Sequence, residues 1–318
     1  MAGANEEPIT GFHDKISRDP KSKYPAQPGR YHLYVSYACP WASRCLAYLK
    51  IKGLEKAILF TSVKPIWGKT KPGVDNHMGW LFPATSTEEP GAEPDPLYGA
   101  KSIRQLYDIA CPQYAGGYSV PVLWDAEQKA IVNNDSGEII RMLNTEMNEF
   151  ATHPEVDLYP RYLRPKIDET NEWVYTNINK GVYKCGFAKD QQTYDDAVKP
   201  CFESLDRCEK TLRRQRFMCG HQLTEADIRL FVSLIRFDEA YGALFNCNKK
   251  LLREYPHLFN FTKDIYQMFD ISSTVNMVHI KKHYYKSHPD YNPMGIIPIG
   301  PNIDYSEPHN RLKFPIGI

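Results

Sequence analysis

The sequence predicts an α/β domain followed by an all-α domain. Strand and helix patterns alternate through the first 150 residues, in the order strand, helix, strand, helix, hairpin, helix. Beyond this point helical patterns dominate as far as Lys286, and no further pair of strands is indicated. A length of 318 residues also favours two domains.

The first strand and the first helix are joined by a single cysteine. Residues 31–37 alternate in the manner of a half-buried strand, and Pro40 suits the first position of the helix that continues through Leu46 to Ile51. Cys39 is therefore expected at the helix N-cap, where the positive end of the helix dipole favours a thiolate and a reactive cysteine. The alternative is that Cys39 is a small buried hydrophobe.

A second strand, from Ala57 to Val63, completes a β-α-β unit with parallel strands. A helix is expected from Ser102 to Ala110, before a hairpin whose strands begin at Val120 and Ala130. Pro121 cannot donate to the ladder, so we place it at the start of its strand, with a cis bond to Val120.

The last helix of this domain is indicated by Asn134-Asp135-Ser136, which precedes an apolar-periodic run. The resulting order, β-α-β and then β-β-α, is that of a thioredoxin-like domain. In the second domain, Thr224 and Asp227 have the spacing of a capping box and predict a buried helix after them.

The expected organisation has four parts. Residues 1–30 are polar and form an extended arm that wraps the surface or is partly disordered. Residues 31–149 form the thioredoxin-like domain, which includes a long irregular loop at 64–100. Residues 150–286 form the helical domain, and the proline-rich tail at 287–318 is expected to be non-helical and to lie along the surface.

Composition favours a small-molecule partner. With 39 basic and 38 acidic residues the net charge is +1, which gives no electrostatic signal for nucleic acid or an anionic membrane. No apolar run reaches the 18 residues of a membrane span, and residues 1–15 lack the apolar core of a signal peptide, so a cytoplasmic location is expected. The eight cysteines lack zinc-type pairs and are expected to be reduced.

One histidine group needs separate consideration as a metal site. His279 and His283 lie four residues apart, and His288 follows them. No glutamate or cysteine stands at the spacing that would complete a zinc site, so no metal is predicted. Cys45 is expected to lie in the core, and Ala42 stands where a dithiol motif would have its second cysteine.

Several motifs carry a resemblance to a known family. In chain order they are Cys39-Pro40-Trp41-Ala42, Val120 to Trp124, Ile131 to Met142, Asn179 to Lys184, Leu223 to Phe231, and His283-Tyr284-Tyr285 with Asn292 to Ile296. Together they resemble the glutathionyl-hydroquinone reductases, the Xi class of the glutathione transferases. The resemblance runs from about Arg18 to Tyr305 and implies the glutathione transferase fold.

The resemblance implies a reaction in which glutathione reduces S-glutathionyl-hydroquinones to hydroquinones and glutathione disulfide is released. Cys39 would attack the glutathionyl sulfur, and a second glutathione would resolve the mixed disulfide. Glutathione is then a substrate, glutathionylated aromatic compounds are the other partners, and no metal, flavin or nicotinamide is needed. The family resemblance also implies a homodimer.

The resemblance also implies a set of glutathione-binding residues. Val120, just before Pro121, offers its N–H and C=O to the tripeptide backbone as a strand edge would. Asp135 would pair with the γ-glutamyl ammonium, and Ser136 would hydrogen-bond the carboxylate at the helix N-terminus. Trp80 corresponds to a family tryptophan at this site. Taken alone, Ser136 would be an ordinary helix cap.

For the aromatic acceptor, the resemblance assigns Tyr183, Tyr241 and Tyr284, whose hydroxyls could hold a hydroquinone oxygen and supply a proton. Tyr285 could exchange roles with Tyr284.

Several positions depart from the family's usual pattern, including the segment Ala240 to Phe245, which lacks the usual aromatic and histidine pattern. Gly117 and Tyr118 replace a stretch that commonly contains arginine, Asp135 replaces a glutamate, and Ser43 replaces a histidine.

Two other functions are compatible with the same residues. An Omega-type thioltransferase or dehydroascorbate reductase would use the same monothiol exchange on broader substrates. A non-catalytic ligand-binding scaffold would keep the fold without the chemistry, which the N-cap position of Cys39 disfavours.

Overall fold

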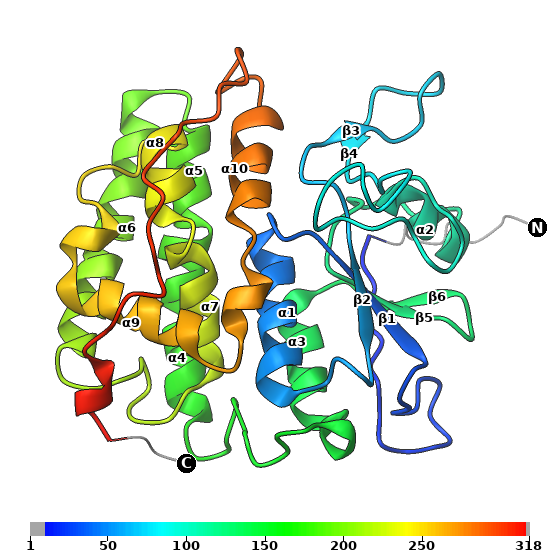
Figure 1. The fold of residues 1–318 in the computed structure, drawn as a ribbon, viewed down its shortest axis with the longest axis horizontal. Coiled ribbons are helices and arrows are strands. Elements are labelled where there is room, and N and C mark those ends of the chain that lie inside the picture. The colour runs from blue at the N-terminus through cyan, green and yellow to red at the C-terminus, as the bar shows by residue number, and fades with distance from the viewer. Residues whose placement is uncertain (1–9, 316–318) are drawn as a thin grey trace, which may run out of the picture. The chain divides into compact units, whose positions relative to one another are not determined.

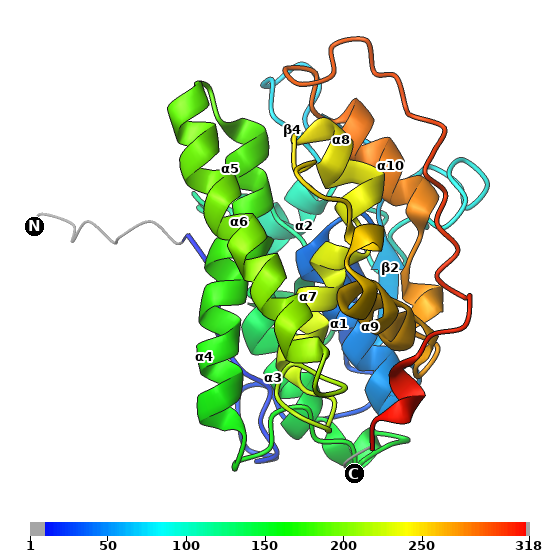
Figure 2. The same ribbon diagram turned by 90° about the vertical axis from the view of Figure 1, so that its left-hand side faces the viewer.

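The computed structural model describes residues 10–315, and the chain divides after Pro154 into two units. The first unit, Met1–Pro154, contains the sheet, and the second, Glu155–Ile318, is helical (Figures 1 and 2).

The first unit is organised around a four-stranded sheet. Its strands are β1 (Tyr31–Val35), β2 (Leu59–Ser62), β5 (Val122–Asp125) and β6 (Ala130–Asn133), in the order β2-β1-β5-β6. The strands β1 and β2 pair in parallel, as predicted, and β5 runs antiparallel to both of its neighbours. This is the sheet of a thioredoxin-like domain.

Three helices cover the sheet. Helices α1 (Pro40–Lys52) and α3 (Ser136–Thr145) lie side by side on one face, and α2 (Ile103–Ala110) lies on the other (Figure 1). The peptide bond between Val120 and Pro121 is cis, as predicted. The expectation of a half-buried first strand is wrong, because every residue of β1 is buried. A strand in the middle of a sheet covered on both faces has no solvated side.

The described part of the arm, residues 10–30, runs along the first unit. Ile16 and Tyr24 are buried, and His13 forms an isolated bridge with Asn133, the last residue of β6. Residues 1–9, the rest of the predicted arm, lie outside the described residues.

The long loop at 64–100 contains a short hairpin of β3 (Gly68–Lys69) and β4 (Met78–Gly79). Its later part is fixed to the sheet by a hydrogen bond of 2.7 Å from Tyr34 Oη on β1 to Asp95 Oδ1.

Apart from an isolated bridge between Phe217 and Gly220, the regular secondary structure in the described residues of the second unit is helical, as predicted. Its principal helices are α4 (Arg164–Val174), α5 (Gly181–Phe187), α6 (Gln191–Leu212), α7 (Glu225–Leu234), α8 (Gly242–Leu244), α9 (Pro256–Gln267) and α10 (Met277–Lys286). Short 3₁₀ segments are η1 (Asn148–Phe150, in the first unit), η4 (Leu252–Glu254) and η5 (Ile271–Thr274). Two π-helical segments, η2 (Tyr175–Asn179) and η3 (Phe237–Tyr241), were not predicted from the sequence.

The predicted capping box begins α7, where the Asp227 carboxylate accepts the backbone N–H and the hydroxyl of Thr224. Nearly every residue of α7 is buried, which confirms the buried helix predicted there. Burial of Asp227 raises the pKa of its carboxyl to about 6, although the backbone N–H groups of Met218 and Thr224 donate to it.

The tail lies along the second unit (Figure 2). Lys263 Nζ donates to Pro308 O, and Gln267 Nε2 donates to Tyr305 O. The prediction of a wholly non-helical tail is wrong, because residues Arg311–Lys313 form a 3₁₀ turn, η6. Here the buried Arg311 guanidinium donates to main-chain carbonyls of Gln215 and Arg216 and holds the turn in place.

Three further observations concern the described part of the chain as a whole. No helix in it is long and apolar enough to cross a membrane. Its residues contain no group of three or more His, Cys, Asp or Glu side chains arranged to hold a metal ion. The eight cysteines, which all lie within residues 10–315, form no disulfide.

Candidate active site

Cys39 occupies the N-cap of α1, as predicted. Its backbone is extended, Pro40 follows as the first helical residue, and its carbonyl accepts the N–H of Ser43 at 2.9 Å. The side chain is 8% exposed, and no side-chain cap bond forms to the first turn of the helix. Cys39 therefore lies at the positive end of the α1 dipole, which favours a thiolate.

The structure brings Cys39 together with the residue before the cis proline. The thiol donates to Val120 O, with 3.5 Å between Sγ and the oxygen. Within residues 10–315 the Val120 N–H has no hydrogen-bond partner, because β5 begins only at Val122. The backbone at Val120 is thus a short stretch of strand edge beside the sulfur.

Asp135 and Ser136 begin α3, and their capping roles differ from the expectation. The cap is Asp135, whose Oδ1 accepts the N–H of Glu138 at 3.0 Å, whereas Ser136 is the first helical residue. The second carboxylate oxygen of Asp135, which is exposed, accepts no hydrogen bond from the described residues. The Ser136 hydroxyl likewise has no partner among residues 10–315.

These residues lie near α1 because α1 and α3 pack against each other. The thiol of Cys45, which is buried as predicted, lies 3.9 Å from Ser136 O. A helix N-terminus with an uncommitted carboxylate oxygen and hydroxyl can receive both the ammonium and the carboxylate of an amino acid.

Trp80 is placed by the long loop and by α2. It follows β4, its carbonyl accepts the N–H of Ile103 at 3.0 Å, and its ring meets that of Trp67 edge to face at 5.6 Å. The ring is largely buried.

The second unit brings the three predicted tyrosines together. Tyr284 Oη lies 2.6 Å from Tyr183 Oη and 3.0 Å from Tyr241 Oη, although 101 and 43 residues separate these pairs in the chain. Tyr285 does not join this tyrosine trio, because its hydroxyl donates to Glu239 O. The structure therefore selects Tyr284 over Tyr285 as the residue that meets the other two.

Burial controls the electrostatics of the trio. It raises the pKa of Tyr284 well above the usual value, and the neighbouring Tyr241 raises it further. Tyr284 and Tyr241 are buried, whereas Tyr183 is partly exposed. The trio is thus a chain of three hydroxyls whose partly exposed end is Tyr183.

Phe245 and Phe187 are aromatic residues around the trio to which no role was assigned from the sequence. Phe245 stacks on Tyr241 with 5.7 Å between ring centroids and also contacts Tyr183. Phe187 follows Tyr183 by one helical turn, and the two rings lie 5.9 Å apart. The i,i+4 spacing of two aromatic residues on α5 was a signal that could have revealed this pair.

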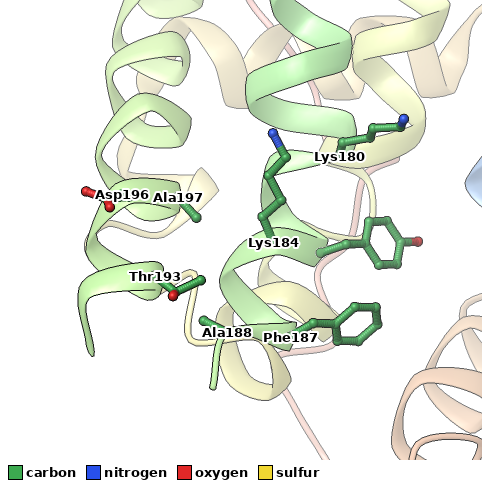
Figure 3. A pocket seen from close by; sticks show the side chains of 8 residues that line it. Lys180, Lys184, Phe187, Ala188, Thr193, Asp196 and Ala197 are labelled. Carbon is green, nitrogen blue, oxygen red and sulfur yellow. The ribbon is translucent and has the colours of Figure 1, made fainter. Parts of the chain in front are cut away.

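A groove of about 620 Å³ opens beside Tyr183, between α5 and α6 (Figure 3). It is lined mainly by apolar atoms, with Phe187 on one side and Thr193 and Ala197 on the other. Lys184 extends along the groove, and its ammonium group forms no ion pair with the described residues. Such a surface suits a flat aromatic molecule.

The three histidines do not form a metal centre among residues 10–315. The rings of His283 and His288 lie 5.4 Å apart, and burial lowers the pKa of His288. His279 is buried on α10.

Tyr107, which holds the residues before Val120 and before Asp135, was not predicted from the sequence. Tyr107 Oη donates to Ser119 O at 3.0 Å and accepts from Asn134 Nδ2 at 3.0 Å. These bonds span 12 and 27 residues, and no local pattern signals them.

Comparisons with known proteins agree with this geometry. Residues 38–146 match the family model of the glutathione S-transferase N-terminal domain, and residues 191–264 match that of the C-terminal domain. The chain is 48% identical over 286 residues to glutathionyl-hydroquinone reductase YqjG of Escherichia coli, covering 90% of this chain and 84% of the relative. It is 42% identical over 277 residues to glutathionyl-hydroquinone reductase PcpF of Sphingobium chlorophenolicum, covering 86% and 84%.

Solved structures show the same relationship. The glutathione-bound structure of YqjG has a TM-score of 0.88 with 45% identity, covering 96% of this chain and 99% of that one. The Xi-class transferase of Natrialba magadii has a TM-score of 0.90 with 42% identity, covering 96% and 90%.

Proposed function

We propose that this chain, which belongs to the glutathione S-transferase family, reduces S-glutathionyl-hydroquinones with glutathione and releases the hydroquinone and glutathione disulfide. Its relatives YqjG and PcpF bear the name of this activity. The single observation that carries the proposal is Cys39, a thiol at a helix N-cap whose sulfur lies 3.5 Å from the Val120 carbonyl oxygen.

Glutathione is bound through its backbone and its γ-glutamyl end. The cysteinyl N–H and C=O pair with the backbone of Val120, whose own N–H has no partner within residues 10–315. The second oxygen of Asp135 receives the ammonium, and the Ser136 hydroxyl at the α3 N-terminus receives the carboxylate. Trp80 and Pro121 complete the surface around the tripeptide.

The chemistry proceeds in two exchanges. The Cys39 thiolate attacks the glutathionyl sulfur, an S–S bond forms, and the bond between that sulfur and the ring carbon breaks. The electron pair of the broken bond stays on the ring carbon, which takes a proton to give the hydroquinone. The thiolate of a second glutathione then attacks the glutathionyl sulfur on Cys39, which releases glutathione disulfide and restores the Cys39 thiolate.

The tyrosine trio supports the proton transfer. Tyr183, its accessible member, donates the proton, and Tyr284 relays hydrogen-bond polarisation from the buried Tyr241. Burial keeps Tyr284 protonated, since the pKa of its hydroxyl is raised well above the usual value. The acceptor ring packs against Tyr183 and Phe187 in the groove between α5 and α6.

A comparison of activity on three substrates tests this function against the Omega-type alternative. Purified protein is assayed with glutathionyl-menadiol, glutathionyl-chlorohydroquinone and dehydroascorbate, each with glutathione. We expect turnover of the two glutathionyl-hydroquinones, with kcat/KM at least about tenfold above that for dehydroascorbate. Cys39→Ser should remove the activity, and Cys45→Ser, which changes a buried thiol on the same helix, should retain it. Preferred turnover of dehydroascorbate would make the Omega-type function the correct one.

Assembly as a homodimer and a cytoplasmic location remain predictions. Eight cysteines without a disulfide fit a reducing compartment. Light scattering at micromolar concentration should give twice the chain mass of 36.7 kDa, and a monomer mass would refute the dimer.

A further inference from the structure

The glutathione-side segments of the first unit, the backbone before Pro121 and the start of α3, belong to different loops. They lie at the two ends of the β5–β6 hairpin, just before β5 and just after β6, and both must hold fixed positions for one tripeptide to bind across them. The residues that join them are therefore candidates for a role in affinity. This inference rests on the proposed function.

Tyr107 on α2 connects the two segments directly. Its hydroxyl donates to the carbonyl oxygen of Ser119, one residue before Val120, at 3.0 Å. The same hydroxyl accepts from the side chain of Asn134, one residue before Asp135, at 3.0 Å. A hydroxyl has one proton and two lone pairs, so this single oxygen satisfies both partners.

The N-terminal arm contacts both Asn134 and Tyr107 through Phe12. Asn134 Oδ1 accepts the N–H of Phe12 at 3.0 Å, and the Asn134 N–H donates to Phe12 O at 3.1 Å. The Phe12 ring packs edge to face on Tyr107, with 5.9 Å between centroids, and stacks on Tyr114 at 5.3 Å. Tyr114 in turn donates to Gly117 O at 3.0 Å, in the loop that leads to Val120.

We propose that Tyr107, through Ser119 and Asn134 and with Phe12 of the arm packed against it, is a positioning residue that sets the spacing of the two glutathione-binding segments. Tyr107 touches neither glutathione nor the acceptor and acts through its two hydrogen-bonded neighbours. When its hydroxyl is missing, the two loops must be ordered by the ligand, and that ordering cost weakens binding.

The chemistry of Tyr107 suits a brace, meaning a residue that holds the two glutathione-side segments at a fixed spacing. The residue is 0% exposed, and burial raises the pKa of its hydroxyl to about 12, so the hydroxyl keeps its proton over the pH range of enzyme assays. Its phenylalanine variant would leave the Ser119 carbonyl and the Asn134 amide without a partner while preserving the ring packing.

Tyr34→Phe is a matched control. Tyr34 is equally buried in the same unit, and its hydroxyl donates to Asp95 Oδ1 at 2.7 Å, away from both segments. Each variant removes one buried phenol oxygen, so a general loss of stability should appear in both. Only the loss of Tyr107 should change how glutathione binds.

The experiment measures glutathione binding by calorimetry to the full chain in a Cys39→Ala background, where no mixed disulfide forms. We expect Tyr107→Phe to raise the glutathione Kd about tenfold, equivalent to the loss of one or two hydrogen bonds, and Tyr34→Phe to leave it within about twofold. In the protein with Cys39 intact, Tyr107→Phe should raise KM for glutathione and leave kcat at saturation nearly unchanged.

Equal glutathione Kd values for Tyr107→Phe and its parent, or equal changes in both tyrosine variants, would overturn the brace. If Tyr107→Phe does not fold, Phe12→Ala takes its place in the experiment. A glutathione Kd raised by about threefold or more, with an unchanged circular dichroism spectrum, supports the brace. An unchanged Kd overturns it. Absence of glutathione binding to the Cys39→Ala parent would overturn the proposed function and the brace together.

Discussion

The thiol of Cys39 donates a hydrogen bond to the carbonyl oxygen of Val120, with 3.5 Å between the sulfur and the oxygen. This contact joins the candidate nucleophile to the backbone proposed to pair with the cysteinyl residue of glutathione. A tripeptide paired at Val120 carries its own sulfur close to Cys39, because that sulfur belongs to the residue whose backbone is held. The backbone proposed to bind glutathione and the thiol proposed to attack its sulfur therefore lie next to each other.

Replacement of the nucleophile should separate chemistry from binding. Cys39→Ala removes the sulfur but leaves the contacts of Val120, Asp135 and Ser136, so we expect deglutathionylation to fall by at least about a thousandfold while the glutathione Kd stays within about threefold. Stopped-flow absorbance measures the first quantity and calorimetry the second. Substantial activity in Cys39→Ala would show that another group attacks the glutathionyl sulfur.

Removal of one hydroxyl from the tyrosine trio should affect the two substrate classes differently. A hydroquinone that leaves through carbon needs a proton, whereas an aliphatic thiolate leaves with little acid help. Tyr183→Phe and Tyr284→Phe should therefore lower kcat for glutathionyl-menadiol by roughly ten- to a thousandfold and spare a small aliphatic mixed disulfide.

Tyr285→Phe is the matched control for Tyr284→Phe, since Tyr285 is adjacent in sequence and buried but donates to Glu239 O instead. Tyr285→Phe should leave the ratio of the kcat values for the two substrates unchanged. Equal losses on both substrates in the trio variants would show that these tyrosines shape the second unit without acting in proton transfer, and the Omega-type function would then lead.

His32 should make the stability of the protein depend on pH. Burial lowers the pKa of this imidazole from 6.5 to about 4, while its Nε2 lies 2.8 Å from Thr61 Oγ1. The unfolded chain binds the proton more tightly, so the contribution of His32 is complete above pH 6.5 and is lost as pH falls through 4. The full shift corresponds to about 3 kcal/mol.

The comparison of wild type with His32→Gln isolates this effect, because Gln does not titrate. Between pH 6.5 and 4 the free energy of unfolding from urea melts should fall more steeply in wild type than in His32→Gln. Asp227 acts with the opposite sign, since its raised pKa removes stability as pH rises from 3.8 to about 6. It is present in both proteins and cancels in the difference. Parallel pH profiles would contradict the assignment to His32.

The capping carboxylate of α7 should be a large contributor to the stability of the second unit. Asp227 accepts from Met218 N, Thr224 N and Thr224 Oγ1, and all of these groups are buried. Asp227→Ala leaves these donors without an acceptor, at a cost of about 2–4 kcal/mol. Asp190→Ala, which removes an exposed cap from α6, should cost only about 1 kcal/mol in the same urea melts. Equal losses of unfolding free energy in the two variants would mean that a buried cap stabilises the protein no more than an exposed one.

Local chemistry made parts of the molecule predictable from sequence. Cys39 before Pro40, and the polar residues before α3, mark helix starts through bonds that span only a few residues. The parallel pairing of β1 with β2 follows from a strand-helix-strand order. The full burial of β1 was missed, because alternation in sequence does not show what covers each face of a sheet.

Long-range contacts account for what the sequence could not reveal by itself. The three trio hydroxyls converge across 43 and 101 residues, and only the resemblance to a family pointed to them. The Tyr107 contacts had no signal at all, because a tyrosine on a short amphipathic helix is expected simply to pack. The π-helical segment that ends at Tyr241 likewise has no sequence signature, although such segments are frequent at functional sites.

The most direct test of the central claim is the covalent state of Cys39 during turnover. Wild-type protein mixed with one equivalent of glutathionyl-menadiol, without free glutathione, should gain the mass of one glutathionyl group on Cys39 and release one equivalent of menadiol. Added glutathione should then remove that mass and yield one equivalent of glutathione disulfide. Release of menadiol with no adduct on Cys39, or with the adduct on another cysteine, would contradict the account.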